Sequence, residues 1–387
     1  MTESDSIKHA DTHEGGIAHA DKHAGAASPR ADPSAPTVPV IIRKRCLHAR
    51  HAASTCTRCT DVCAAKALAF VEQQLVLRTR ACTSCGACAA ACPTEALYIA
   101  APEEHALGRA VMQAAKSGLV RIACRMASGD AQRFSQDKHT EDILVPCLAR
   151  MDPQMLMAAA HAGAKHFVLL EGDCDKCAKR PAKPVVEETV NTLETWLAAQ
   201  GMNETTVELC RNPAGMNSAR RTAFGHLFGI SASRMDKEPF AAPPDNEKRL
   251  AAIQNEPLVR VPDRQRLRLA LFQKGTPDFC RSAPLDAPVI EAEKCACCTL
   301  CADVCPSGAL KLLSQSPFKI LGASLVCCGC GLCADLCFAK AVHLEKITDI
   351  KKAGARVLVE KDGLQNPTAS WEEKLAQFMP DVPIYRS

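Results

Sequence analysis

Residues 82–93 read "CTSCGACAAACP", and this stretch introduces the cysteine pattern around which we expect the chain to fold. Its spacing, C-x2-C-x2-C-x3-C-P, recurs intact at residues 295–306 and again at 327–337, where Phe338 replaces the proline. Three thiolates on such a tight loop bind one iron–sulfur cluster, whereas the fourth cysteine binds the cluster of a neighbouring motif. Zinc sites usually show two separated C-x2-C pairs instead. The spacing therefore predicts [4Fe–4S] clusters whose motifs work in pairs.

In the C-terminal block, the pairing rule gives each cluster three cysteines of one motif and the last cysteine of the other. We expect one cluster to be held by Cys295, Cys298, Cys301 and Cys337, and the other by Cys327, Cys330, Cys333 and Cys305. Two more cysteines, Cys297 and Cys328, would break this spacing as ligands. They are expected to be small apolar residues beside the clusters.

The stretch "RCLHARHAASTCTRCTDVC", residues 45–63, ends like such a motif, but its first cysteine lies ten positions before the second. The intact motif at 82–92 needs a partner, because its last cysteine has no other cluster nearby to bind. We therefore expect one cluster on Cys46, Cys56, Cys59 and Cys92, and another on Cys82, Cys85, Cys88 and Cys63. Residues 47–55 would form a loop. The alternative is a three-cysteine site with a labile iron or with His48 or His51 as fourth ligand.

These motifs resemble bacterial-type 2[4Fe–4S] ferredoxin domains, as in a polyferredoxin. The resemblance implies two such domains, at residues 41–100 and 286–345. The implied fold class is α+β, with these ferredoxin-like domains flanking a small parallel α/β module.

That module is expected at residues 119–210, where four strand patterns alternate with helical patterns. The strands are expected at 118–123, 142–146, 166–171 and 205–209, and the helices at 152–164 and 186–200. A cysteine follows each strand, and open α/β folds bind ligands at the carboxyl edge of a parallel sheet. The candidate cofactor-binding residues are Cys124, Cys147, Cys174, Cys177 and Cys210.

Residues 119–180 also resemble the delta subunit of methyl-viologen-reducing hydrogenase and the matching end of heterodisulfide reductase A-type proteins. The shared features are an early strand that ends in cysteine, "CLARMDP" before a helix, and "AGAKHFVLLEGDC". The resemblance implies a [2Fe–2S] cluster that passes electrons between partner enzymes, although "EGDCDKC" departs from the Cys/His-rich ending of the family. A zinc site, a redox disulfide and inert buried cysteines are the alternatives.

The other segments have weaker patterns. Residues 1–40 are expected to be a disordered His/Ala-rich tail, although "HADTHEG" and "HADKHAG" have histidine spacings that suit a metal if helical. Residues 101–118 suggest a helical connector. We expect 211–285 to be a linker with one short amphipathic helix at 219–230, and 346–387 to be a tail.

Positive charge gathers around the odd first motif, in "IIRKRC" and at Arg50, His51 and Arg58. Such a patch steers an acidic redox partner, or it offsets the negative charge of clusters and thiolates. The sequence favours neither reading over the other.

Composition limits the function. The chain has 387 residues, 24 of them cysteines, and a net charge of +4, which does not by itself indicate nucleic-acid binding. Its first 40 residues lack the apolar segment of a signal peptide and no apolar run spans a bilayer, so we expect a reducing cytoplasmic location. Nucleotide-binding motifs, haem attachment sites and catalytic constellations are absent.

We therefore expect a protein that relays electrons between redox partner proteins through four [4Fe–4S] clusters, with one additional [2Fe–2S] cluster in the middle module. One alternative is an electron-wiring subunit of a hydrogenase, formate dehydrogenase or heterodisulfide-reductase-like complex. The other is a redox-sensing or assembly factor whose middle cysteines switch.

Overall fold

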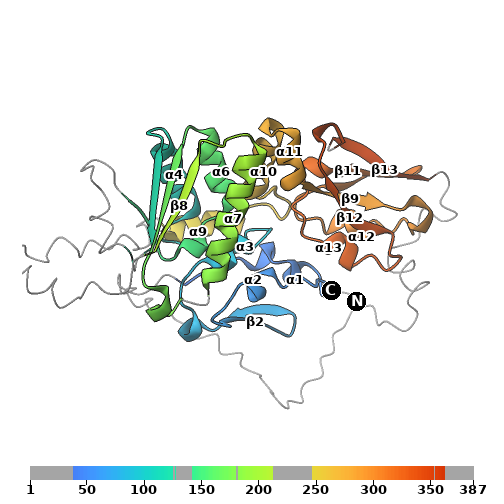
Figure 1. The fold of residues 1–387 in the computed structure, drawn as a ribbon. Coiled ribbons are helices and arrows are strands. Elements are labelled where there is room, and N and C mark those ends of the chain that lie inside the picture. Colours follow the sequence, from blue (N-terminus) through green and yellow to red (C-terminus); the bar gives the residue numbers. More distant parts are fainter. Residues whose placement is uncertain are drawn as a thin grey trace, which may run out of the picture.

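The structure is a computed structural model that describes residues 38–124, 127, 142–179, 182–211, 246–352 and 354–361. Its helices and strands form three parts, which lie against one another in Figure 1: an N-terminal cysteine domain, a middle α/β domain and a C-terminal cysteine domain. The His/Ala-rich tail, up to residue 37, and the helix expected at 219–230 lie outside the described residues.

The N-terminal cysteine domain, residues 38–100, has two small antiparallel pairs of strands. Strand β1 (Val40–Ile41) pairs with β4 (Leu97–Tyr98), and β2 (Leu68–Val71) forms a hairpin with β3 (Gln74–Leu77). Three one-turn helices connect them: α1 (Leu47–Arg50), α2 (Arg58–Asp61) and α3 (Ala87–Ala91). A few aliphatic side chains and several cysteines make up its core.

The middle domain, residues 104–211, contains the parallel sheet that the sequence predicts. Its strand order is β6–β5–β7–β8, with bounds Leu119–Cys124 for β5, Ile143–Val145 for β6, His166–Glu171 for β7 and Thr206–Arg211 for β8. All three strand pairings are parallel, so that prediction is confirmed. Three helices complete this domain: α4 (Glu104–Ala115), α6 (Pro153–His161) and α7 (Lys183–Ala199). Helices α4 and α7 contact the sheet, and α6 contacts both of them. Asp152 caps α6, since its carboxylate accepts from the Gln154 N–H at 2.6 Å, and Pro153 occupies the first turn.

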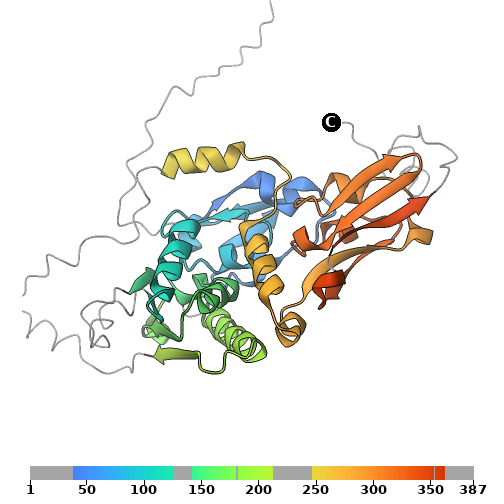
Figure 2. The ribbon, with the colours of Figure 1, turned by 90° about the horizontal axis from the view of Figure 1, so that it is seen from above.

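The sequence predicted a linker at 211–285, but the last part of that segment is helical. Residues 246–282 form α9 (Asn246–Asn255), α10 (Asp263–Lys274) and α11 (Pro277–Ser282). Figure 2 shows α9 beside the N-terminal domain and α10 between the middle and C-terminal parts. Helix α10 has weak apolar periodicity because many of its side chains are charged. It is held by the buried side chains of Leu271 and Phe272 and by ion pairs such as Arg264 with Asp152.

The C-terminal cysteine domain, residues 285–361, has two sheets. Strand β9 (Leu285–Ile290) pairs antiparallel with β12 (Val342–Ile347), and β10 (Leu310–Gln315), β11 (Phe318–Ala323) and β13 (Ala355–Lys361) form a second sheet. The one-turn helices α12 (Leu300–Asp303) and α13 (Leu332–Asp335) follow the cysteine loops. Strand β13 therefore extends the domain into the segment that was expected to be a tail.

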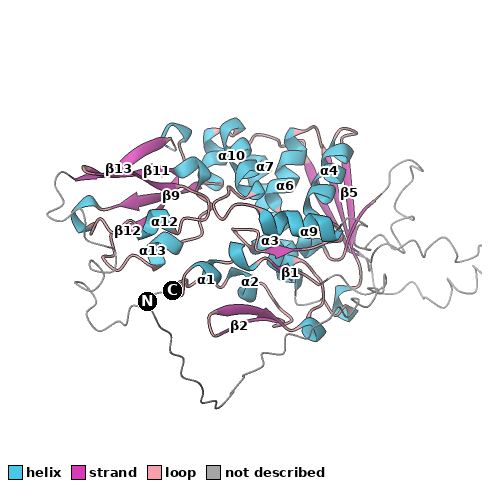
Figure 3. Ribbon diagram, turned by 180° about the vertical axis from the view of Figure 1, so that it is seen from behind, coloured by secondary structure: helices cyan, strands magenta, loops and turns pink. Residues whose placement is uncertain are grey.

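Within the part of the chain that the structure describes, no helix is both long and apolar enough to cross a membrane. Figure 3, from behind, shows short helices of the two cysteine domains, α1 and α13, next to each other. The two cysteine domains are in contact, since Leu47 of the first is buried with Leu332 and Leu336 of the second, far along the sequence.

Candidate iron–sulfur sites

The first cysteine of all four motifs has the same backbone setting. A single 3-10 turn ends immediately before each one, at Arg43–Arg45, Thr79–Ala81, Ala292–Lys294 and Ser324–Val326. The cysteines that follow are extended, with φ between −72° and −66° and ψ between 120° and 132°. Cys46 therefore has the same backbone conformation as Cys82, Cys295 and Cys327, although nine residues rather than two separate it from the next cysteine.

The loops of the three intact motifs share two left-handed residues, which turn the chain between successive thiols. These residues are Ser84 and Gly86 (φ 54° and 86°), Cys297 and Thr299 (55° and 66°), and Gly329 and Gly331 (63° and 82°). The spare residue Cys297 thus has a conformational role in its loop. In the odd motif, the matching Thr57 is not left-handed and has φ −118°.

The backbone that follows the last cysteine also has the same conformation in each motif. The third residue after it is left-handed in every motif, at Lys66, Glu95, Gly308 and Lys340. In three motifs the next N–H then donates to the cysteine sulfur at 3.2 Å, from Ala67 to Cys63, from Ala96 to Cys92 and from Ala341 to Cys337. Such N–H···S bonds orient a thiolate ligand and tune the reduction potential of an iron–sulfur centre.

The cysteines gather in four sets, each of which takes its last member from the neighbouring motif. Set 1 is Cys46, Cys56, Cys59 and Cys92; set 2 is Cys63, Cys82, Cys85 and Cys88; set 3 is Cys295, Cys298, Cys301 and Cys337; set 4 is Cys305, Cys327, Cys330 and Cys333. This crossed grouping is the one expected from the spacing.

The electrostatics of set 1 illustrate the grouping. Burial, and then the negative charge of Cys92, Cys56 and Cys46, raise the pKa of Cys59 to about 12. In set 3, burial and then Cys298, Cys295 and Cys337 raise the pKa of Cys301 to about 12. Four thiolates so close together are unfavourable without a compensating cation, and a coordinating metal deprotonates its thiols outright.

The cavities inside two sets fit a shared inorganic group. All four cysteines of set 3 line one small cavity with Phe318 and Val342, and all four of set 2 line another with Ala182. Among the described residues, no three Cys, His, Asp or Glu side chains approach closely enough for a single metal ion. All-thiolate donors around a cavity, spaced more widely than for one ion, suit a cluster better than zinc.

The two histidines considered as alternatives to Cys46 have other partners. The His48 Nε2 atom is 2.8 Å from the Cys56 carbonyl oxygen, its Nδ1 atom is 3.4 Å from the Gln73 side chain, and its ring lies 3.9 Å from that of Phe70. His51 accepts the Ala53 N–H at 3.1 Å. Cys46 is buried within set 1, near Cys92.

Four of the five candidate cysteines of the middle domain come together at the carboxyl edge of the sheet. Burial, and then Cys85, Cys124 and Cys174, raise the pKa of Cys147 to about 12. Burial, Glu171, Cys124 and Cys177 likewise raise the pKa of Cys174 to about 11. The Gly172 N–H donates to the Cys124 sulfur at 3.2 Å. We call Cys124, Cys147, Cys174 and Cys177 the middle set.

The structure does not bring Cys210 into this set. Burial and Glu208 raise its pKa to about 11, and no cysteine contributes to that shift. Strand β8 continues to Arg211, so Cys210 lies within the strand, opposite Leu170, rather than after its end. The sequence prediction ended β8 one residue before Cys210, but it also ended β5 one residue before Cys124, which still belongs to the middle set. What differs is the strand order, because β8 lies at the edge of the sheet with β7 between it and β5.

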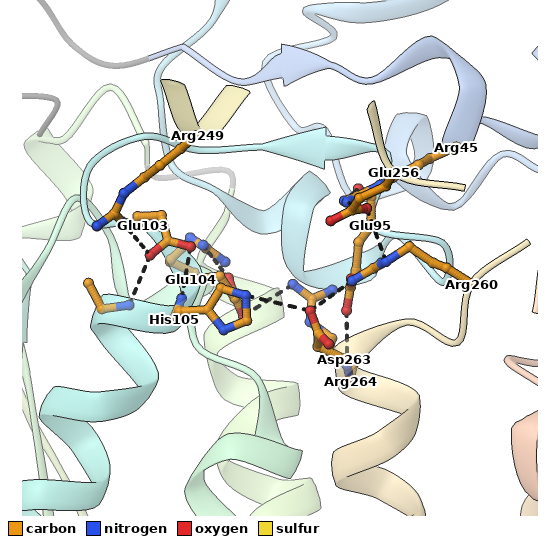
Figure 4. A network of polar contacts seen from close by, with 12 residues as sticks. Arg45, Glu95, Glu103, Glu104, His105, Arg249, Glu256, Arg260, Asp263 and Arg264 are labelled. Atoms are coloured by element: carbon orange, nitrogen blue, oxygen red, sulfur yellow. Dashed lines mark hydrogen bonds and ion pairs between the residues drawn. The ribbon is translucent and has the colours of Figure 1, made fainter. Parts of the chain in front are cut away.

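A charged network that the sequence did not reveal fastens α10 to the N-terminal domain (Figure 4). Arg260 donates to Glu95 at 2.6 Å, and buried Arg264 donates to the carbonyls of Ala89 and Ala90, at the end of α3, at 2.5 and 2.8 Å. Arg264 also pairs with buried Asp152 at 3.0 Å. Ion pairs thus tie the loop that carries Cys92 to the middle domain.

The positive patch around the odd motif is largely used within the chain. Arg45 pairs with Glu256, Lys44 donates to the Glu256 carbonyl at 2.5 Å, and Arg58 donates to the Gly329 carbonyl at 2.7 Å. Arg50 donates to the Leu258 carbonyl. These contacts favour an internal role for the patch over docking of an acidic partner.

Two segments of the chain match the models of known protein families. Residues 76–98 match the model of the 4Fe-4S binding domain, and residues 121–224 match that of the methyl-viologen-reducing hydrogenase delta subunit. Both resemblances stated from the sequence are therefore confirmed for these segments. Neither match reaches the cysteine motifs at 295–306 and 327–337. No significant match was found among curated proteins or among solved structures.

Proposed function

We propose that this protein transfers electrons between redox partner proteins through four [4Fe–4S] clusters and one [2Fe–2S] cluster. A 4Fe-4S domain and a hydrogenase delta-subunit-like domain in one chain indicate iron–sulfur electron transfer. The observation that carries the finer proposal is the crossed arrangement of sets 1 to 4. Each set has four thiols, and each takes its last one from the neighbouring motif, as two-cluster ferredoxins do.

In this proposal, sets 1 and 2 hold the two cubes of a ferredoxin-like N-terminal domain. Sets 3 and 4 hold those of a ferredoxin-like C-terminal domain, and the middle set holds the [2Fe–2S] centre. The clusters supply one-electron chemistry, which the described side chains do not. The chain contributes thiolates, N–H···S bonds from Ala67, Ala96 and Ala341, and apolar walls that exclude water.

A second candidate function is a wiring subunit within a larger oxidoreductase complex, such as a hydrogenase, formate dehydrogenase or heterodisulfide-reductase-like assembly. The match of residues 121–224 to a hydrogenase subunit favours it. A redox sensor is the less supported alternative, because the middle set lies next to set 2 through Cys147 and Cys85 rather than apart from the other thiols.

The test is anaerobic purification from the native host, with iron and sulfide measured per chain and bound proteins identified. About 18 irons match four cubes and a [2Fe–2S] centre, and about 16 match the cubes alone. About 8 irons would refute the four-cube proposal. Stable co-purification of a catalytic subunit would favour the wiring function. Thiol oxidation at Cys174 and Cys177 without electron transfer through the clusters would favour a sensor.

A further inference from the structure

We propose that the insertion at residues 47–55 joins the two cysteine domains into one electron path, by docking set 1 against set 4. This inference rests on the proposed function. An ordinary motif has two residues between its first and second cysteines, whereas nine residues lie between Cys46 and Cys56, so this loop is seven residues longer and extends toward the other domain. With it, the five sets follow one another in the order middle, 2, 1, 4, 3.

The end of the insertion binds directly to the helix of the set 4 motif. The Thr55 N–H and hydroxyl donate to the two carboxylate oxygens of Asp335 at 2.9 and 3.0 Å. Just beyond the insertion, Arg58 donates to the carbonyl of Gly329, which lies between Cys327 and Cys330, at 2.7 Å. These contacts bridge more than 270 positions of sequence and end inside the cysteine loop itself.

An apolar contact closes the same junction. Leu47, the first residue of the insertion, is buried with Leu332 of α13 and with Leu336, which follows that helix. Cys56 and Cys330 pack against this cluster. One thiol of set 1 and one of set 4 therefore border the same few leucines. Arg50 reaches the same side, where its side chain lies 3.5 Å from the Val304 carbonyl, next to Cys305 of set 4.

A comparison within the chain shows why Asp335 is available for this contact. In two other motifs the matching aspartate is occupied locally: Thr57 donates to Asp61 and Thr299 donates to Asp303, both at 2.7 Å. In the set 4 motif, glycine occupies the place of that threonine, at residue 331. Asp335 has no local hydroxyl to bind and accepts from the insertion instead.

The remaining steps of the path lie within or beside the domains. Cys147 of the middle set neighbours Cys85 of set 2, and Cys88 of set 2 neighbours Cys59 of set 1. On the other side, Cys333 of set 4 neighbours Cys301 of set 3. In each transfer one electron leaves the donor centre and enters the acceptor centre, and no covalent bond forms or breaks. The junction made by the insertion is the step that connects the two halves.

The experiment compares Asp335→Lys with Asp303→Lys in the full-length, cluster-loaded protein. Both changes put the same cation on the same helix position of a cysteine motif, but only Asp335 contacts the insertion. Iron per chain is measured first. Two readouts follow: deuterium exchange of the peptide that contains residues 47–57, and redistribution of electrons after a radiolysis pulse at several protein concentrations.

In the wild type and in Asp303→Lys, we expect protection of that peptide and redistribution that does not depend on protein concentration. In Asp335→Lys, with iron retained, we expect loss of the protection and loss of the concentration-independent step between the halves. The proposal is overturned if the peptide exchanges as in the control, or if it is exposed while redistribution stays unchanged.

If Asp335→Lys loses iron, Arg50→Ala, which changes no cysteine and no residue of the motif at 327–337, is judged by the same two readouts. Failure of the proposed function is distinct from these outcomes, because it would appear as a wild-type protein without the expected iron.

Discussion

Replacing Cys46 with serine tests the least regular ligand set. The structure places Cys46 after a 3-10 turn like that before Cys82, Cys295 and Cys327, and groups it with Cys56, Cys59 and Cys92. If these four hold one cube, Cys46→Ser leaves three thiolates and a labile cluster. Sets 2, 3 and 4 and the middle set keep all their thiols. Iron should then fall by about 4 atoms from about 18 per chain.

The assay is iron and sulfide analysis of anaerobically purified protein, with the reduced clusters quantified by electron paramagnetic resonance. The matched control is Cys297→Ser, which also removes a buried thiol from a cysteine motif. Cys297 is outside every set, so this variant should keep the wild-type iron content.

Two results would refute the reasoning. Equal iron in Cys46→Ser and Cys297→Ser would show that Cys46 is not a ligand. A loss of about 8 irons from Cys46→Ser would show that sets 1 and 2 are lost together, against the assumption that each set retains its own cluster.

Three further predictions follow from the same geometry. Gly86→Ala should lower the temperature of cluster loss more than Gly331→Ala. Both positions are left-handed, which costs roughly 1–2 kcal/mol for alanine, but only at Gly86 would the new Cβ lie 2.4 Å from Arg150. Equal shifts would contradict this. Arg264→Met should lower the free energy of unfolding, measured by chemical denaturation, by about 3–5 kcal/mol, because it leaves the buried Asp152 carboxylate without its cation; an unchanged free energy of unfolding would count against the network. Iodoacetamide alkylates the thiolate form of cysteine, and burial raises the pKa of the Cys210 thiol to about 11. The rate of alkylation of Cys210 should therefore rise about tenfold per pH unit above pH ~8. Peptide mass spectrometry follows this rate, and a plateau near pH ~9 would contradict the prediction.

Sequence spacing determined the local geometry of the cysteine motifs. The C-x2-C-x2-C-x3-C runs specify short turns and one-turn helices, so the loops at Cys82, Cys295 and Cys327 have nearly the same conformation. The alternation of strands and helices likewise predicted the parallel sheet of the middle domain, because apolar periodicity is a local property of the chain.

Boundaries were less predictable. Strands β5 and β8 end one and two residues later than predicted, and such differences at a strand end are below what periodicity resolves. The strand order, which puts β7 between β8 and β5, was not predicted, and it leaves Cys210 outside the middle set. Helix α10 was missed for another reason. Its sequence has only weak apolar periodicity, and its contacts, which include buried Leu271 and Phe272 and the ion pair of Arg264 with Asp152, join residues far apart in the sequence.

The sequence by itself determined that the cysteines come as four motifs and which of them are intact. Only the tertiary structure decided that Cys46 lies with Cys56, that Cys210 lies apart, and that Thr55 reaches Asp335. The physical reason is the range of the forces involved. Turn conformation depends on a few neighbouring residues, whereas the packing of one domain on another depends on contacts that no local pattern records.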